Sequence, residues 1–218
     1  MLSLLFFDKL FRLTRTISAL RLAWPPRNSR ESKTDIGILT ITQAARLLEN
    51  AAPEVLPYIA IGLFAGLRRA ELERLDWSEV DFESGLIKVT AEKSKTAQRR
   101  FVTMQPNLRE WLLPLREVSG NVTPRGWNFR QAFDRAREAA GIAEWPDNAL
   151  RHSFASYHMA HFKNAASTAL ELGHHDSRIT FAHYRELVKP KDAERYWNIR
   201  PVAAGKKDRA ALWLALST

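Results

Sequence analysis

The sequence contains no cysteine in its 218 residues. Without thiols the chain can form neither a disulfide framework nor a thiolate zinc site, and it has no cysteine nucleophile. This absence also suits a reducing cytoplasm. Long apolar runs are missing as well, because the run Leu4–Phe7 ends at Asp8, far short of the roughly 20 residues that cross a bilayer. The sequence therefore predicts no transmembrane helix and no membrane partner.

Residues 2–22 interleave apolar and basic side chains, whereas a signal peptide has a continuous apolar centre. The pattern is typical of a helix that lies on a surface. It ends at Trp24-Pro25-Pro26, and a polar run that is typical of a linker follows. We therefore expect three parts, which are an N-terminal basic amphipathic segment with its linker at 1–36, a folded domain at 37–200 and a C-terminal tail at 201–218.

Acidic residues are in the minority, since 33 Lys and Arg stand against 24 Asp and Glu, for a formal net charge of +9. Such a surplus favours a polyanionic partner, either nucleic acid or an anionic membrane. Its distribution is more informative than its sum, because residues 93–137 hold ten Lys and Arg against three Asp and Glu. This segment is the part of the domain that we expect to face DNA.

Hydrophobic periodicity predicts an α+β domain that is mainly helical. Helical spacing begins after Thr42, the expected N-cap, and an apolar helix follows Pro53 and ends in the region 62–66. The period then changes to two, which predicts a small three-stranded antiparallel sheet. The expected strands are 80–82, 86–89 and 100–103, and the later helices are 107–117, 128–140, 150–161, 164–172 and 190–197.

An arginine directly follows the apolar helix, in the segment Gly66-Leu67-Arg68-Arg69-Ala70-Glu71-Leu72. Glu71 stands three residues after Arg68, so its carboxylate can hold the guanidinium while the remaining N–H groups point at an anion. An ordinary surface salt bridge is the alternative interpretation.

A basic loop separates the second and third predicted strands, with Ser94-Lys95-Thr96 at its tip. A lysine at this tip can enter a groove or reach a phosphate, while the strands fix its base. The alternative is a charge that protects a sheet edge from aggregation.

All six histidines fall between residues 152 and 183, which raises the question of a metal site. The spacing does not support one, because there is no His-Glu-x-x-His pattern and the chain offers no Cys. We expect His158, His161 and His175 to be solvated or hydrogen-bonded side chains.

Five short motifs are informative because of the order in which they occur along the chain. They are Gly-Leu-Arg-x-x-Glu-Leu with Arg68, Ser-Lys-Thr with Lys95, Leu-Arg-His-Ser-Phe with Arg151, Leu-Gly-His with His174, and then Tyr184. In this order they resemble the catalytic domain of the tyrosine recombinases, the phage-integrase family, over residues 37–200. The resemblance implies the DNA breaking-rejoining catalytic fold, double-stranded DNA as partner, a homotetramer on DNA, no cofactor, no metal, and a prokaryotic cytoplasmic location at the nucleoid.

The resemblance also implies a role for each motif residue. Arg68 and Arg151 form the arginine pair, Lys95 is the hairpin lysine, His174 is the histidine of Leu-Gly-His, and Tyr184 is the nucleophile. Asn148 departs from the family, since most members have a His three residues before the second Arg. Glu71 and His152 are expected to support the site, although the family's histidine at position 152 is generally not the catalytic one. The DNA-binding residues that we expect are Lys93, Arg99, Arg100, Arg125 and Arg130.

The chemistry of these side chains fits the assignment. A Tyr hydroxyl can form a covalent phosphodiester that is later displaced, and two bidentate Arg groups can stabilise the developing charge without a metal. Lys95 is the expected acid for the 5′-oxygen. Asn148 can donate a hydrogen bond but cannot carry a proton, so any acid–base task of the usual His is absent or lies elsewhere. The remaining tyrosines, Tyr58, Tyr157 and Tyr196, are expected to serve packing.

Two functions remain open at the level of sequence. The first is a site-specific recombinase or integrase that acts through a 3′-phosphotyrosyl intermediate. The second function is that of a truncated integrase remnant that binds DNA weakly without catalysis. Its motivation is that family members usually carry an N-terminal helical domain that clamps the duplex, and residues 1–36 do not resemble one. A type IB topoisomerase shares the chemistry but fits the motifs less well. In the tail, the apolar residues that either contact a neighbouring subunit or pack on their own domain are Leu212, Trp213, Leu214 and Leu216.

Overall fold

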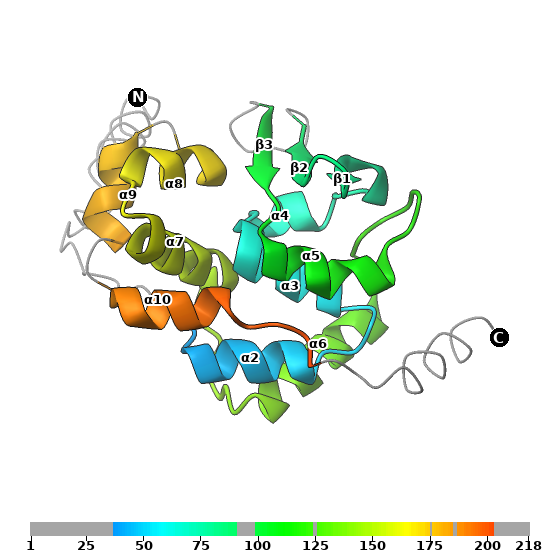
Figure 1. Ribbon diagram of the computed structural model, residues 1–218. Helices are drawn as coiled ribbons and strands as arrows, with labels where there is room; N and C mark the ends of the chain where they lie inside the picture. Colours follow the sequence, from blue (N-terminus) through cyan, green and yellow to red (C-terminus); the bar gives the residue numbers. More distant parts are fainter. Residues whose placement is uncertain (1–36, 91–98, 124–125, 175, 185–186, 203–218) are drawn as a thin grey trace, which may run out of the picture. The chain divides into compact units, whose positions relative to one another are not determined.

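The computed structural model describes residues 37–90, 99–123, 126–174, 176–184 and 187–202 (Figure 1). The expected N-terminal segment and the apolar residues of the tail lie outside these ranges. In chain order the elements are α2 (Ile41–Glu49), α3 (Leu56–Ala65), α4 (Arg69–Leu72), the 3-10 helix η1 (Trp77–Glu79), β1 (Val80–Asp81), β2 (Leu86–Val89), β3 (Arg100–Thr103), α5 (Pro106–Leu112), the 3-10 helix η3 (Leu113–Leu115), α6 (Trp127–Ala139), α7 (Ala149–Phe162), α8 (Ala165–Leu172), α9 (Ser177–Tyr184) and α10 (Pro190–Trp197).

The prediction of a mainly helical domain with a small antiparallel sheet is confirmed, but the start of the first helix was wrong. Thr40, not Thr42, caps α2, because its Oγ1 accepts the Gln43 N–H at 3.2 Å. The Gln43 side chain in turn accepts the Thr40 N–H at 3.0 Å, which completes a capping box that only the earlier threonine can form. The short helices α4 and α9, which carry or border site residues, were not predicted.

The sheet joins its strands in the order β1-β2-β3, all antiparallel, with Ile87 opposite Val80 on one side and Val102 on the other. Alternation buries one face of β2 and β3 through Ile87, Val89 and Val102. Strand β3 also lies beside α8, so the sheet adjoins the helical layer at this strand (Figure 1).

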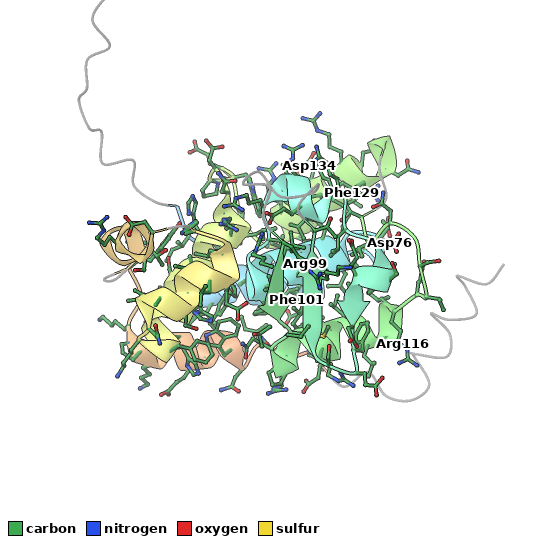
Figure 2. The ribbon with its side chains drawn as sticks, turned by 90° about the horizontal axis from the view of Figure 1, so that it is seen from above. Asp76, Arg99, Phe101, Arg116, Phe129 and Asp134 are labelled. Atoms are coloured by element: carbon green, nitrogen blue, oxygen red, sulfur yellow. The ribbon has the colours of Figure 1, made fainter. Side chains whose placement is uncertain are left out.

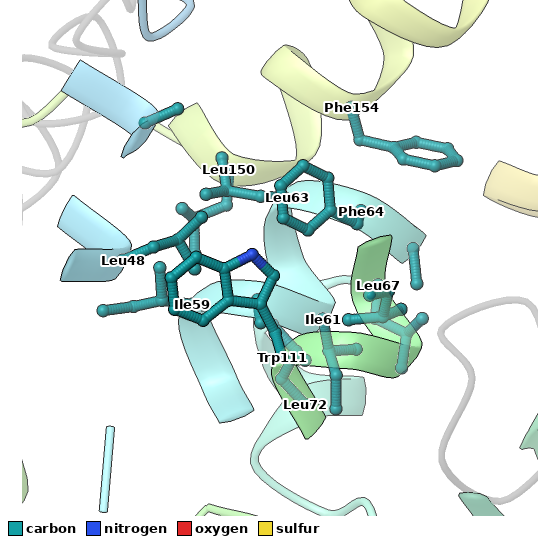
Figure 3. Close-up of a cluster of buried hydrophobic side chains, with 14 of the residues drawn as sticks. Leu48, Ile59, Ile61, Leu63, Phe64, Leu67, Leu72, Trp111, Leu150 and Phe154 are labelled. Atoms are coloured by element: carbon teal, nitrogen blue, oxygen red, sulfur yellow. The ribbon is translucent and has the colours of Figure 1, made fainter. Parts of the chain in front are cut away.

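Helix α3 is the centre of the core because eight of its ten residues are buried, and it packs between α5 and α7. Figure 3 shows its side chains meeting Trp111 of α5 and Leu150 and Phe154 of α7. Tyr157 and Tyr196 stack at 3.8 Å between ring centroids and are buried, which confirms their packing role. This core holds the start of α7 against the end of α3.

Gly66 ends α3 and permits a close approach between α3 and α7. Its φ is +64°, a left-handed conformation that favours glycine. A Cβ at this position would lie 2.2 Å from Cδ1 of Phe154 on α7, so any larger residue would push the helices apart. The turn brings Arg68 and the Gly66 carbonyl next to α7.

In the part of the chain that the structure describes, none of the helices could span a lipid bilayer.

Candidate active site

Glu71 is buried and lies at the centre of an arginine cluster. Its side chain is 1% exposed and holds two guanidinium groups, with Arg68 NH1 donating to Oε1 at 3.0 Å and Arg100 donating from NH1 and NH2 at 2.9 and 2.7 Å. The Arg68 backbone N–H adds a fourth bond at 2.8 Å. Burial would raise the pKa of Glu71, but the hydrogen bonds and charge of Arg100, with the bonds from Arg68, outweigh it and keep this pKa below its usual range.

The C-terminal end of α8 holds three arginines through three successive backbone carbonyls. Arg100 Nε donates to the Glu171 carbonyl at 3.1 Å, Arg151 NH2 to that of Leu172 at 2.7 Å, and Arg68 NH2 to that of Gly173 at 3.2 Å. The last carbonyls of a helix lack partners within the helix and carry partial negative charge, so they suit guanidinium donors. One helix end thus orients groups from α7, β3 and the turn before α4.

Arg151 is the most buried of the three arginines, with 8% of its surface exposed. Its NH1 donates to the Gly66 carbonyl at 2.6 Å, and its NH2 contacts both the Leu172 carbonyl and Nε2 of His174, the latter at 3.1 Å. Burial, together with the charges of Arg68 and Arg100, lowers its pKa to about 9, so the guanidinium stays charged at neutral pH. Three of its five N–H donors are therefore engaged by described residues.

His174 acts here as an acceptor for Arg151. A guanidinium only donates, so Nε2 must be unprotonated, and Nδ1 carries the ring proton toward Oγ1 of Thr180 at 2.9 Å. Burial and the charge of Arg151 lower the pKa of His174 to about 4, which keeps the ring neutral. The contacts of His174 therefore orient Arg151, and its ring does not take up a further proton at neutral pH.

Tyr184 ends α9 and lies beside His152, which follows Arg151 on α7. The phenol oxygen is 2.8 Å from His152 Nδ1, and Tyr184 is 5% exposed. Burial raises the pKa of Tyr184, and the positive charge of Arg151 opposes that rise. The predicted nucleophile is therefore in the arginine site, although its helix was not predicted.

An open groove of about 900 Å³ reaches the site from the side of α4 and α6. Asn148 and Arg151 line it together with Arg130, and the exposed Asn148 has φ +52°, a left-handed conformation that asparagine tolerates. The groove thus brings two predicted catalytic positions and one predicted DNA-binding position onto one surface.

The other predicted DNA-binding residues differ in their placement. Arg99 is exposed, and its guanidinium carbon lies 4.8 Å from the ring centroid of Phe101 on β3 (Figure 2). Arg100 instead points inward to Glu71, with its side chain 10% exposed. The predicted residues that lie outside the described ranges are Lys93, Lys95 and Arg125.

Sequence reasoning missed Thr180 and gave two other partners of the site, Arg100 and His152, less specific or different roles. It placed Arg100 among the DNA contacts, not on Glu71, it gave no role to Thr180, and it treated His152 only as a supporting residue. Arg100 and Glu71 are 29 residues apart, so periodicity could not join them. The one signal for His152 was its position next to Arg151 in the sequence.

The remaining histidines agree with their predicted roles where they are described. His158 is buried and its Nδ1 lies 2.8 Å from Thr168 Oγ1, whereas His161 is exposed. His175 lies outside the described residues. Within the described part of the chain, no group of three or more His, Asp or Glu side chains is arranged to hold a metal ion.

Because the fold buries neutral histidine side chains, we expect it to lose stability in mild acid. Burial lowers the pKa of His158 to about 4, from 6.5, with a further contribution from the charge of His161. Between these two pH values His158 binds a proton in the unfolded chain but not in the folded chain. The free energy of unfolding therefore falls as pH falls from 6.5 toward 4. We expect His158 to contribute on the order of 1–2 kcal/mol to the difference between pH 7 and pH 5.

Urea unfolding at the two pH values measures this difference, and His158→Gln is the comparison because it removes one titrating group. The variant should show a smaller loss between pH 7 and pH 5 than the unsubstituted chain. An equal loss in both proteins would contradict the assignment to His158.

The charges of the cluster suit a phosphodiester. Arg68, Arg100 and Arg151 carry three positive charges against the one carboxylate of Glu71, so the described cluster holds an excess of about two charges. A phosphodiester brings one negative charge, and attack on phosphorus concentrates further charge on its oxygens. The site is thus electrostatically matched to a transferring phosphoryl group more than to a neutral ligand.

Comparisons with known proteins agree with this geometry. The model of the phage integrase family matches residues 38–190. The chain is 29% identical over 170 residues to the prophage integrase IntF of Escherichia coli (strain K12), a match that covers 71% of this chain. It spans 34% of the length of IntF, about a third of that curated relative.

Two solved structures share the fold. The catalytic domain of bacteriophage HP1 integrase superposes with a TM-score of 0.55 at 24% identity, over 84% of this chain and 98% of that one. The XerA recombinase superposes with a TM-score of 0.57 at 22% identity, over 76% of this chain and 66% of that one. The α+β domain thus has the fold of the tyrosine-recombinase catalytic domains.

Proposed function

The chain belongs to the phage integrase family, and from this premise we propose that it is a site-specific DNA recombinase that cleaves and rejoins strands through a 3′-phosphotyrosyl intermediate. The observation that carries the proposal is the convergence of Arg68, Arg151 and Tyr184 from three separate segments of the chain. These are the residue types that covalent phosphoryl transfer requires, namely a hydroxyl nucleophile and bidentate cations.

Each group has a defined task in this reaction. Tyr184 attacks the scissile phosphorus, and the guanidinium groups of Arg68 and Arg151 neutralise charge on the non-bridging oxygens. His174 orients Arg151 through Nε2. Lys95 protonates the departing 5′-oxygen. Since Glu71 and the end of α8 hold the arginines before substrate arrives, the site needs little reorganisation during the reaction.

Double-stranded DNA is the proposed partner, bound as a tetramer of this chain. Arg68 and Arg151 would bind the scissile phosphate, while Arg130 in the adjoining groove and Arg99 on the sheet would contact flanking phosphates. Such contacts are ionic, so affinity should fall steeply with salt.

Covalent capture tests the proposal whatever the target sequence is. A pool of nicked duplexes of randomised sequence, in which the cleaved end diffuses away, would trap the enzyme on the sites that it cuts. We expect selected sequences and a phosphotyrosyl peptide that contains Tyr184. DNA binding without any adduct would instead favour the second candidate, a non-catalytic DNA-binding remnant, for which Asn148 at the usual His position is the motivating observation.

A further inference from the structure

We propose that His152 is the general base of strand cleavage, which accepts the phenol proton of Tyr184 as the phenolate attacks phosphorus. The inference rests on the proposed recombinase function. It assigns to His152 the acid–base task that Asn148 cannot perform. It is carried by the contact between His152 Nδ1 and the Tyr184 hydroxyl at 2.8 Å. This is the distance at which a proton passes between a donor and a base.

Tyr184 needs such an acceptor because of its surroundings. It is 5% exposed, so bulk water has little access to the hydroxyl. Burial also raises the pKa of the phenol above its ordinary value of 10.0, which places spontaneous ionisation further from neutral pH. The positive charge of Arg151 stabilises the phenolate once it forms, but a guanidinium cannot take the proton.

Two other polar residues among the described ones, Asn148 and His174, are unsuited to the task. Asn148 has a side-chain amide, which forms hydrogen bonds but does not accept a proton. His174 already uses Nε2 to accept a hydrogen bond from Arg151, and its Nδ1 carries the ring proton toward Thr180. Of the side chains at positions 148, 152 and 174, the imidazole of His152 is in hydrogen-bond contact with the nucleophile.

Helix geometry explains how the task can move from position 148 to position 152. The His152 N–H donates to the Asn148 carbonyl at 2.9 Å, so the two residues are one helical turn apart at the start of α7. Residues four apart lie on the same helix face, as do residues three apart. Asn148 is the N-cap of α7 and His152 lies one turn further along it, next to Arg151 in the sequence, so a base at position 152 stays beside the second arginine of the site.

The proposed step balances in atoms and charge. The bond between Tyr184 Oη and phosphorus forms, the bond between phosphorus and O5′ breaks, and the Tyr184 proton moves to Nδ1 of His152. O5′ receives a proton from Lys95. In rejoining, the O5′ hydroxyl attacks phosphorus and returns its proton to the Lys95 amine, the phosphotyrosyl bond breaks, and Nδ1 of His152 returns its proton to the departing phenolate.

The decisive variant is His152→Asn, because the Asn oxygen can occupy the place of Nδ1 and accept the Tyr184 hydrogen bond without holding the proton. The full chain would be tested on a nicked duplex that the unsubstituted chain selects from the randomised pool. We expect cleavage to slow by about 10²–10⁴-fold. DNA binding in a gel-shift series should stay within about threefold, because the substitution removes no phosphate contact.

A duplex with sulfur in place of the bridging 5′-oxygen separates the base from the acid, since a thiolate leaves without being protonated first. The defect of His152→Asn should persist on this duplex. Loss of the defect would overturn the proposal and make His152 the acid for the leaving group. Cleavage by His152→Asn within about threefold of the unsubstituted chain would also overturn it, because a hydrogen bond alone would then suffice.

If His152→Asn does not fold, cleavage by His152→Ala is measured with and without added imidazole. Restoration of cleavage by imidazole, and not by formamide, supports a proton acceptor, whereas no restoration or equal restoration by both overturns it. His161→Asn, an exposed position on the same helix, is the matched control and should cleave normally. If the unsubstituted chain selects no duplex, the proposed function itself fails, a result distinct from failure of the base assignment.

Discussion

Tyr184→Phe should abolish the covalent DNA adduct, with a loss of at least about 10⁴-fold that reaches background. The substitution removes the oxygen that bonds to phosphorus and keeps the ring in its buried position at the end of α9. The hydrogen bond with His152 is lost, which costs about 1 kcal/mol of folding free energy and leaves the domain folded. Denaturing gel analysis of the trapped adduct measures the result.

The control is Tyr157→Phe, which removes a buried hydroxyl elsewhere on α7. Its OH donates to the Leu39 carbonyl at 3.0 Å, so the variant should lose about 1 kcal/mol of stability and still form the adduct. DNA affinity should be nearly the same for both variants, since neither hydroxyl contributes positive charge. An adduct that persists in Tyr184→Phe would assign the nucleophile to another residue.

Glu71→Gln should destabilise the fold by about 3–5 kcal/mol and disorder the arginine cluster. The carboxylate accepts four hydrogen bonds, and it is the countercharge of Arg68 and Arg100. An amide of the same size presents an NH₂ group to one pair of these donors and leaves the partly buried guanidinium groups of Arg68 and Arg100 without their countercharge. Urea unfolding measures the loss, and slower cleavage should accompany it because Arg68 is no longer oriented.

Glu73→Gln, two residues further along the chain, provides the matched control for this prediction. Glu73 pairs with Arg69 at 2.7 Å, but both side chains are well exposed to solvent. An exposed pair of this kind contributes less than about 1 kcal/mol. Equal destabilisation by the two substitutions would show that burial of Glu71 is not the cause.

Much of the candidate site could be predicted from the sequence because its motifs are local. The positions of Arg68, Arg151 and His174 follow from short segments whose order is specific, and Glu71 is close enough to Arg68 for a direct contact to be expected. The sheet strands were also predictable, since their alternation buries one face. The N-cap of α2 was wrong by two residues, because two threonines compete and only the pairing with Gln43 distinguishes them.

The chemical groups of the candidate site can be read from the residues alone, namely two motif arginines, a tyrosine hydroxyl and an amide at position 148. Which of these groups contact one another depends on the folded chain. Glu71 binds Arg100 across 29 positions of sequence, and one helix end orients three arginines. His152 meets Tyr184 across 32 positions. Such pairings depend on how α7, α8 and β3 pack, and packing is a property of the whole core that local patterns do not carry.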